Sequence, residues 1–131
     1  MGRVLALDSG AIIALARGDA YAAALVQEIR EDGGSVAVPA PVLAEVLRGG
    51  RSDAAVHRVL NAIDYELTTT PRAARAAGAA IGRVRGAPSL TLDALIVETA
   101  VEHGTDGIMT QDLRDMRALA AGRLVILPSA P

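Results

Sequence analysis

Along almost the whole chain, short apolar runs typical of β-strands alternate with longer segments typical of α-helices. Strands are predicted at Val4–Leu7, Ser35–Val38, Tyr65–Leu67, Gly107–Met109 and Leu124–Leu127. Helices are predicted between them, at Ala11–Ala16, Ala20–Glu31, Pro41–Leu47, Asp53–Ala62, Arg72–Val84, Leu92–Glu102 and Leu113–Ala120. Strands that alternate with helices favour parallel pairing, because each helix returns the chain to the same end of the sheet. The pattern therefore predicts an α/β fold with a central parallel sheet of four to five short strands, flanked by helices on both faces.

The length and composition of the chain favour a single domain over residues 1–131. The 131 residues can bury a sizeable core, and 51% of them are hydrophobic. No apolar run is long enough to span a bilayer, and the run before Asp8 is too short for the core of a signal peptide. The chain has no cysteine, which excludes disulfides, zinc–thiolate sites and cysteine catalysis. We therefore expect a cytoplasmic protein that makes no membrane contact.

All 13 basic residues are arginines, and with 15 acidic residues the net charge is −2. The absence of lysine excludes a Walker-type phosphate lysine, a Schiff base and the lysine of receiver-type phosphoacceptor domains. A protein that binds nucleic acid over a broad surface is usually basic overall. The charge balance by itself therefore does not indicate a nucleic-acid partner.

Two aspartates come shortly after predicted strands. Asp8 follows the first strand directly, and Asp112 lies three residues after the end of the fourth. Ligands of open parallel sheets bind outside the carboxyl ends of the strands, which is where both aspartates are expected. Each also has a hydroxyl nearby in the sequence, Ser9 beside Asp8 and Thr110 before Asp112.

Two further acids lie in predicted helices with apolar surroundings. Glu45 has mostly apolar near neighbours, and Asp93 begins a helical face that is otherwise apolar. The residues three, four, seven and eight positions after Asp93 are Ile96, Val97, Ala100 and Val101. A carboxylate at the head of a buried face is costly unless something compensates it. By contrast, Glu98 and Glu102 are predicted to lie on another, solvated face of that helix.

Each of the four acids also has an ordinary structural explanation. Asp93 favours a helix N-terminus through the macrodipole, and Asp112 fits an N-cap. Asp8 can satisfy a neighbouring helix N-terminus, and Glu45 can pair with Arg48. The set is harder to explain in this way, because the predicted fold brings all four acids together. Gathered carboxylates repel one another, and a bound cation is the usual compensation.

The available ligands indicate which cation such a site would bind. Carboxylate oxygens, without cysteine or suitably paired histidine, favour Mg²⁺ or Mn²⁺ over zinc. His57 lies in a polar helical segment and His103 beside a glycine that ends a helix, so we expect exposed or capping roles for both. The sequence thus predicts a metal site formed by Asp8, Glu45, Asp93 and Asp112.

Four segments of the chain resemble the signature blocks of PIN-domain ribonucleases, in the same order and at suitable spacing. They are Leu5–Ser9, Pro41–Gly49, Leu92–Ala100 and Met109–Met116. No segment is specific alone, but the ordered set covers nearly the whole chain and is strongly specific. Within that family the chain most resembles the VapC-type toxins of bacterial toxin–antitoxin pairs.

The resemblance implies a compact PIN-like domain with Mg²⁺- or Mn²⁺-dependent endoribonuclease activity, in which metal-activated water cleaves RNA. It also implies a homodimer that is neutralised by a cognate VapB-type antitoxin. It assigns metal binding to Asp8, Glu45, Asp93 and Asp112, an accessory acidic role to Asp115, and supporting roles to Ser9 and Thr110. The sequence departs from the family at Gly10, where a small polar residue is more common, and at Glu98, in a stretch that is usually alanine-rich.

Partner contacts are predicted at two places. The arginines near the signature segments are candidates for contacts with flanking RNA phosphates, or else are solvated surface charges; they are Arg48, Arg114 and Arg117. Tyr21 and Tyr65 are the only aromatic residues, so recognition of bases by a stacking platform is not expected. The apolar helices Ala11–Ala16 and Ala20–Ile29 either offer a groove to an amphipathic antitoxin segment or pack the core.

Two other functions fit part of the pattern. A catalytically idle PIN-like module would bind a partner or RNA as a scaffold, although all four acids are present. A metal-dependent phosphatase or a receiver-like phosphoacceptor would use Asp8, but the missing lysine and the extra acids Glu45 and Asp93 argue against it. Metal-dependent turnover of RNA distinguishes the nuclease from both.

Overall fold

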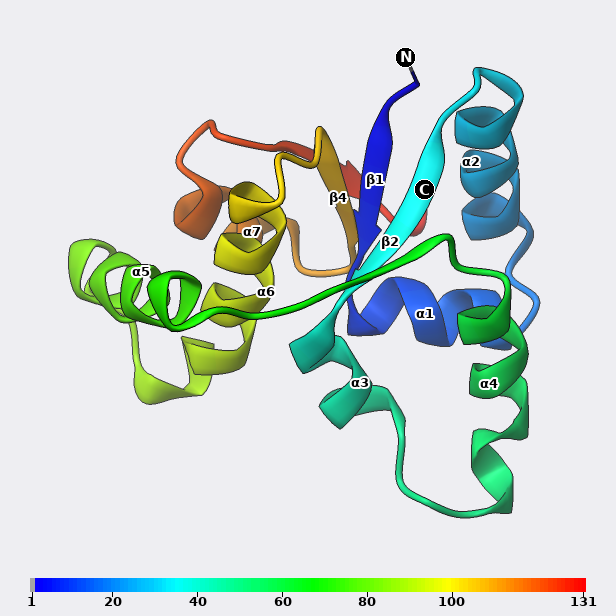
Figure 1. Cartoon of the computed structure of the whole chain (residues 1–131), viewed down its shortest axis with the longest axis horizontal. Helices are drawn as coiled ribbons and strands as arrows, with labels where there is room; N and C mark the ends of the chain where they lie inside the picture. Colours follow the sequence, from blue (N-terminus) through cyan, green and yellow to red (C-terminus); the bar gives the residue numbers. More distant parts are fainter. Residues whose placement is uncertain (1) are drawn as a thin grey trace.

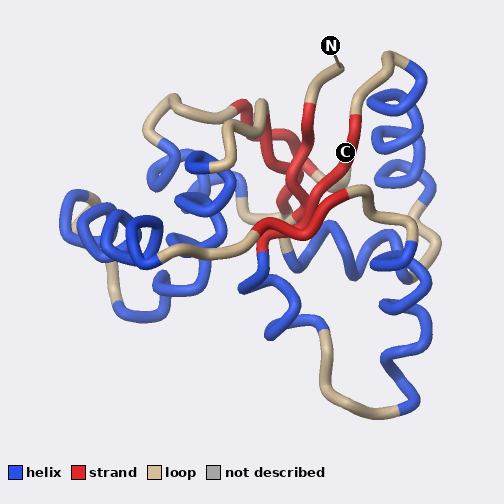
Figure 2. Tube along the Cα trace, in the orientation of Figure 1, coloured by secondary structure: helices blue, strands red, loops and turns tan. Residues whose placement is uncertain are grey.

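A computed structural model describes residues 2–131, and within them five strands form one sheet (Figure 1, Figure 2). The strands are β1 (Val4–Leu7), β2 (Ser35–Pro39), β3 (Tyr65–Leu67), β4 (Gly107–Thr110) and β5 (Val125–Pro128). All neighbouring strands pair in parallel, in the order β3-β2-β1-β4-β5. The predicted α/β fold with a central parallel sheet is therefore confirmed.

Seven α-helices and two 3₁₀ turns connect the strands within this range. They are α1 (Ser9–Ala16), α2 (Ala20–Glu31), α3 (Ala40–Val46), η1 (Arg51–Asp53), α4 (Ala54–Asn61), α5 (Pro71–Arg83), η2 (Pro88–Leu90), α6 (Thr91–Glu102) and α7 (Leu113–Ala120). Helices α1, α2 and α4 lie on one side of the sheet and α5, α6 and α7 on the other, while α3 packs against both α1 and α6 (Figure 1). The predicted bounds differ from these by one or two residues at most.

The three central strands are buried because helices cover both of their faces. Leu5, Val36 and Ile108, one from each strand, are at most 2% exposed. This burial explains why these strands are continuous apolar runs and not alternating ones. The edge strands are less covered, and Tyr65 of β3 and Val125 of β5 are among the exposed large hydrophobic residues.

The carboxyl ends of β1 and β4 lie side by side at the point where the strand order reverses. Leu7 pairs with Met109, and the N–H of Asp8 donates to the main-chain oxygen of Met109 at 3.1 Å. The chain runs from β1 to β2 on one side, whereas β4 and β5 extend the sheet on the other. Such a reversal leaves a crevice at the carboxyl edge, which is where open parallel sheets bind ligands.

No single helix among residues 2–131 is long and apolar enough to cross a membrane. Helices α1 and α2 together reach the required length and composition, but the chain bends by 106° between them. Ala11, Ile12 and Ala14 of α1 are buried in the protein core.

The prediction that Glu98 lies on a solvated helix face is wrong. Glu98 is 4% exposed, and its two carboxylate oxygens accept hydrogen bonds from Arg123 Nη1 and Nη2 at 2.8 and 2.6 Å. Arg123 also donates to the main-chain oxygens of Leu119 and Ala120 at the end of α7. The arginine therefore joins α6 to the turn between α7 and β5. The helical pattern around Glu98 does not contain this partner, which is 25 residues away in the sequence.

A second buried acid, Asp53, supports the loop between α3 and α4. Its carboxylate accepts hydrogen bonds from the N–H of Gly49 at 2.7 Å and from the N–H of Arg48 at 2.9 and 3.1 Å. These bonds, the one from Gly49 foremost, hold the pKa of Asp53 below its usual value. Asp53 is thus buried with its charge compensated, and it fixes the end of α3.

Removing Arg123 would leave the buried Glu98 carboxylate without its partner. We expect Arg123→Ala to lower the free energy of unfolding by about 3 kcal/mol, measured by urea denaturation. Replacing both residues, as Glu98→Leu/Arg123→Ala, should restore part of the loss because no unpaired charge is then buried. Arg75→Ala, which removes an exposed arginine of α5, is the control. If Arg123→Ala is as stable as the wild type, the pair does not stabilise the turn.

Candidate functional site

Asp8 lies at the end of β1 and caps α1. It is 6% exposed, and its Oδ1 accepts a hydrogen bond from the N–H of Ala11 at 2.9 Å. Burial raises the pKa of Asp8 above its usual value, and hydrogen bonds from the Thr110 hydroxyl and from two N–H groups of α1 oppose that rise. The nearby charge of Glu45 raises the pKa further.

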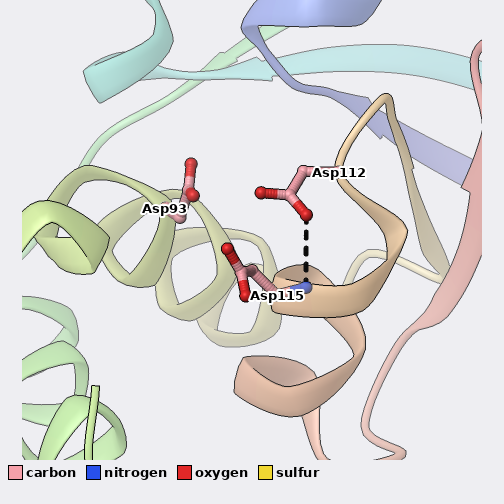
Figure 3. A group of neighbouring side chains, drawn as sticks. All are labelled: Asp93, Asp112 and Asp115. Carbon is pink, nitrogen blue, oxygen red and sulfur yellow. Dashed lines mark hydrogen bonds between the residues drawn. The ribbon is translucent and has the colours of Figure 1, made fainter. Parts of the chain in front are cut away.

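Asp112 and Asp115 stand at the start of α7. The N–H of Asp112 donates to Oγ1 of the fully buried Thr110 at 2.9 Å. Asp112 in turn caps the helix, since its Oδ1 accepts from the N–H of Asp115 at 3.3 Å (Figure 3). A hydrogen bond with Asp112 and the charge of Asp112 raise the pKa of Asp115, while Arg114 lowers it.

Asp93 lies in the first turn of α6, beside Asp112 and Asp115 at the start of α7 (Figure 3). One carboxylate oxygen each from Asp93, Asp112 and Asp115 lie within 4.8 Å of one another. Partial burial raises the pKa of Asp93 to about 6, and neighbouring charges contribute in the order Asp112, Glu45, Asp8 and Asp115. Four acids from three other segments are therefore close enough to act on this carboxyl group.

Glu45 reaches the site from α3. It is half-buried, and its carboxylate accepts a hydrogen bond from the hydroxyl of Ser9, the first residue of α1. The alternative pairing of Glu45 with Arg48 is not seen among residues 2–131. Arg48 instead donates to the main-chain oxygens of Ala44 and Leu47.

The four acids predicted as metal ligands line one cavity of about 190 Å³ at the carboxyl edge of β1 and β4. Its lining residues are Asp8, Ser9, Gly10, Glu45, Asp93, Ile96, Gln111 and Asp112. A larger cavity of about 450 Å³ lies between α1, α2 and α4, and none of its lining residues is acidic. The smaller cavity, which the four predicted acids line together, is therefore the candidate site.

Gln111 was not predicted as a site residue; it is exposed, and its side chain lies over Gly10. A Cβ atom at Gly10 would lie 2.8 Å from Cγ and 2.9 Å from Cδ of Gln111. The glutamine side chain occupies the space that a small polar residue at position 10 would need. The only signal for Gln111 in the sequence is its place between Thr110 and Asp112.

The chemistry of these residues fits a hard divalent cation. Carboxylates supply all of the charged groups in the cavity wall, with neither histidine nor cysteine among its lining residues. The raised pKa values of Asp8, Asp93 and Asp115 show that these carboxylates are costly to ionise where they stand, for Asp93 in part because other acids surround it. A divalent cation offsets such repulsion, and oxygen ligands suit Mg²⁺ or Mn²⁺.

The three arginines predicted to contact RNA are all exposed but differ in position. Arg114 is near enough to Asp115 to lower its pKa. Arg48 lies at the end of α3, close in sequence to Glu45. Arg117 lies about 200° around α7 from Asp115, at about 100° per helical residue, and so points away from the site.

The fold and the site define an α/β protein with a carboxylate centre at the edge of an open parallel sheet. The family model described as "PIN domain" matches residues 5–122. The chain therefore belongs to the PIN domain family, whose members are generally nucleases. The family predicted from the four sequence segments is confirmed.

A solved structure of low sequence identity has the same fold. A chain of the "Crystal structure of VapBC2 from Rickettsia felis bound to a DNA fragment from their promoter" matches with a TM-score of 0.74. The match covers 95% of this chain and 98% of that chain, at 12% sequence identity. At this identity the likeness establishes the fold alone. Comparison with curated proteins finds no match.

The raised pKa of Asp93 predicts that the metal-free protein loses stability as the pH rises. Between pH 3.8 and about 6 the folded protein keeps a proton that the unfolded chain has released. The free energy of unfolding therefore falls as the pH rises through this window. We expect Asp93→Asn to be more stable than the wild type at about pH 7.5 in EDTA, with a difference that shrinks toward pH 4.

Thermal unfolding across this pH range measures the effect. Asp32→Asn, which changes an exposed aspartate outside the site, is the matched control and should follow the wild type. If Asp93→Asn gains no stability at the higher pH, burial and the neighbouring acids do not destabilise the ionised carboxyl group of Asp93.

Proposed function

We propose that the chain is a Mg²⁺- or Mn²⁺-dependent endoribonuclease and the toxin of a toxin–antitoxin pair. The observation that carries the proposal is the convergence of acids from the ends of β1 and β4 and from α3 and α6 on one cavity of a PIN domain. The toxin role is supported by the resemblance of the four sequence segments to VapC-type proteins. The proposal also includes a cytoplasmic homodimer with a cognate VapB-type antitoxin, which rests on the same resemblance.

Asp8, Glu45, Asp93 and Asp112 would hold the cation, because they line the cavity together. A bound divalent cation supplies positive charge toward a phosphate and lowers the pKa of a coordinated water. Asp8 and Asp112 each use one carboxylate oxygen to cap a helix, which restricts the orientation of the carboxylate. The helix caps would thus preorganise two of the ligands.

The remaining residues would orient water and RNA. Asp115, beside Asp93 and Asp112, would accept a hydrogen bond from the attacking water. The Thr110 hydroxyl holds both Asp8 and the N–H of Asp112 in place. Arg114 and Arg48, which are exposed, would contact flanking phosphates, for which a guanidinium is well suited. With so few aromatic residues, selectivity would rest on the shape of the RNA.

Purified protein should cleave a structured RNA in Mg²⁺ or Mn²⁺, and EDTA should abolish the cleavage. We expect Asp8→Asn and Asp112→Asn to lower the rate by about 100-fold or more, because each removes a charged ligand. The same variants should bind Mn²⁺ more weakly in calorimetric titrations. Asp32→Asn makes the same chemical change on the surface of the protein and should keep the wild-type rate.

Two outcomes would contradict the proposal. If Asp8→Asn and Asp112→Asn cleave RNA as fast as the wild type, the acids do not form the active site. If the protein binds RNA or a partner but shows no metal-dependent turnover, it is the catalytically idle module.

The antitoxin would bind the apolar cavity of about 450 Å³ between α1, α2 and α4. Leu15, Val26, Val59 and Ile63 line it and are only partly buried. An amphipathic helix places apolar side chains into a groove of this kind. The groove lies outside the acidic cavity, so its occupation and catalysis can be tested separately.

A charge in this groove should separate the two activities. We expect Val26→Glu to cleave RNA at the wild-type rate but to bind the product of the neighbouring antitoxin gene at least about tenfold more weakly, because the charge would be buried in an apolar interface. Calorimetry and inhibition of cleavage both measure the loss. Ala24→Glu adds the same charge to the exposed face of α2 and is the control. If the antitoxin inhibits Val26→Glu as well as the wild type, it binds elsewhere.

A further inference from the structure

The wall of the acidic cavity is poor in free hydrogen-bond donors. When the carboxyl groups among its lining residues are ionised, they can accept hydrogen bonds but cannot donate them. The Ser9 hydroxyl already donates to Glu45, and Ile96 is apolar. Gln111 is the other polar side chain of the wall, and its amide carries two N–H donors.

The side chain of Gln111 is exposed and lies over Gly10. A Cβ atom at Gly10 would lie 2.8, 2.9 and 3.0 Å from Cγ, Cδ and Oε1 of Gln111. Gly10 has no positive φ, so the backbone does not itself require glycine there. The missing side chain leaves room for Gln111 to lie across the first turn of α1, at the edge of the cavity.

We propose that Gln111 binds the RNA substrate by donating a hydrogen bond from its amide to a phosphate oxygen beside the cleaved bond. Phosphate oxygens accept hydrogen bonds, as carboxylates do, so RNA that enters this cavity needs a donor. An arginine or lysine in this position would pair with the carboxylates and compete with the cation for them. A neutral amide supplies the donor without that competition. The inference rests on the proposed function.

The first test separates RNA binding from turnover. We expect Gln111→Ala to raise KM for a fluorescein-labelled RNA about tenfold, with kcat within about twofold, as for the loss of one hydrogen bond to a charged group. Gln111→Glu should raise KM further, because it replaces the donor with a charge that repels phosphate. Gln27→Ala removes the other glutamine of the chain, which lies exposed on α2, and is the matched control.

Two further readouts do not depend on turnover. Fluorescence anisotropy of the same RNA in the Asp8→Asn background should show a similar loss of affinity for Gln111→Ala. Calorimetric titration with Mn²⁺ should give the same metal affinity for Gln111→Ala and the wild type.

A double variant tests the contact itself. Gly10→Ala should displace Gln111 and raise KM as Gln111→Ala does, although alanine favours the helix and should not lower the melting temperature. The double variant Gly10→Ala/Gln111→Ala should then have the same KM as Gln111→Ala alone.

The outcomes distinguish this inference from the function on which it rests. If the wild type neither binds nor cleaves RNA, the proposed function falls and Gln111 has no substrate. If the wild type cleaves RNA and Gln111→Ala has an unchanged KM, only the role of Gln111 is overturned. The role of Gln111 would also be overturned if Gln111→Ala binds Mn²⁺ more weakly, or if Gly10→Ala and Gln111→Ala have additive effects on KM.

Discussion

The repulsion among carboxylates gathered at one end of the sheet is the constraint on which the rest of the structure depends. Partial burial and four neighbouring acids raise the pKa of Asp93 to about 6, so the fold must hold these groups together against their charge. It does so with contacts that each join two separate segments. The pairing of Leu7 with Met109 brings the ends of β1 and β4 together, Ser9 holds Glu45, and Arg123 anchors α7 to α6. The hydrophobic core around the central strands offsets the free-energy cost of gathering the acids.

The sequence allowed the fold to be predicted almost completely, because strands and helices are encoded by local periodicity. Asp8 and Asp112 were predictable for the same reason, since each follows a strand that could be recognised. Their ordinary explanation as helix caps also holds, because a carboxylate has two oxygens and capping uses one of them. Glu98 and Gln111 were not predictable in this way. The burial of Glu98 depends on Arg123 from another element, and the contact of Gln111 with Gly10 joins residues that are far apart in the sequence.

The charge of the chain and its family membership point in different directions, and the site explains how both can hold. A net charge of −2 gives no general attraction for RNA. In a PIN domain with an acidic cavity, attraction for phosphate would come from the bound cation and from a few donors at the rim. Binding of this kind is local, and it would depend on divalent metal more than on the overall charge of the surface.

The site depends on the number of residues in helices α6 and α7 as well as on which residues they contain. Asp93 and Glu98 are five residues apart on α6, which turns them about 140° from each other, so that one faces the acids and the other faces Arg123. Helix α7 fixes a second pair of directions in the same way. Asp115 lies in its first turn, and Arg123, just beyond its other end, donates to the main-chain oxygen of Leu119. Inserting or deleting one residue in either helix would rotate one end by about 100° relative to the other. Changes of length between relatives should therefore collect in loops such as that between α3 and α4, while these two helices keep their residue count.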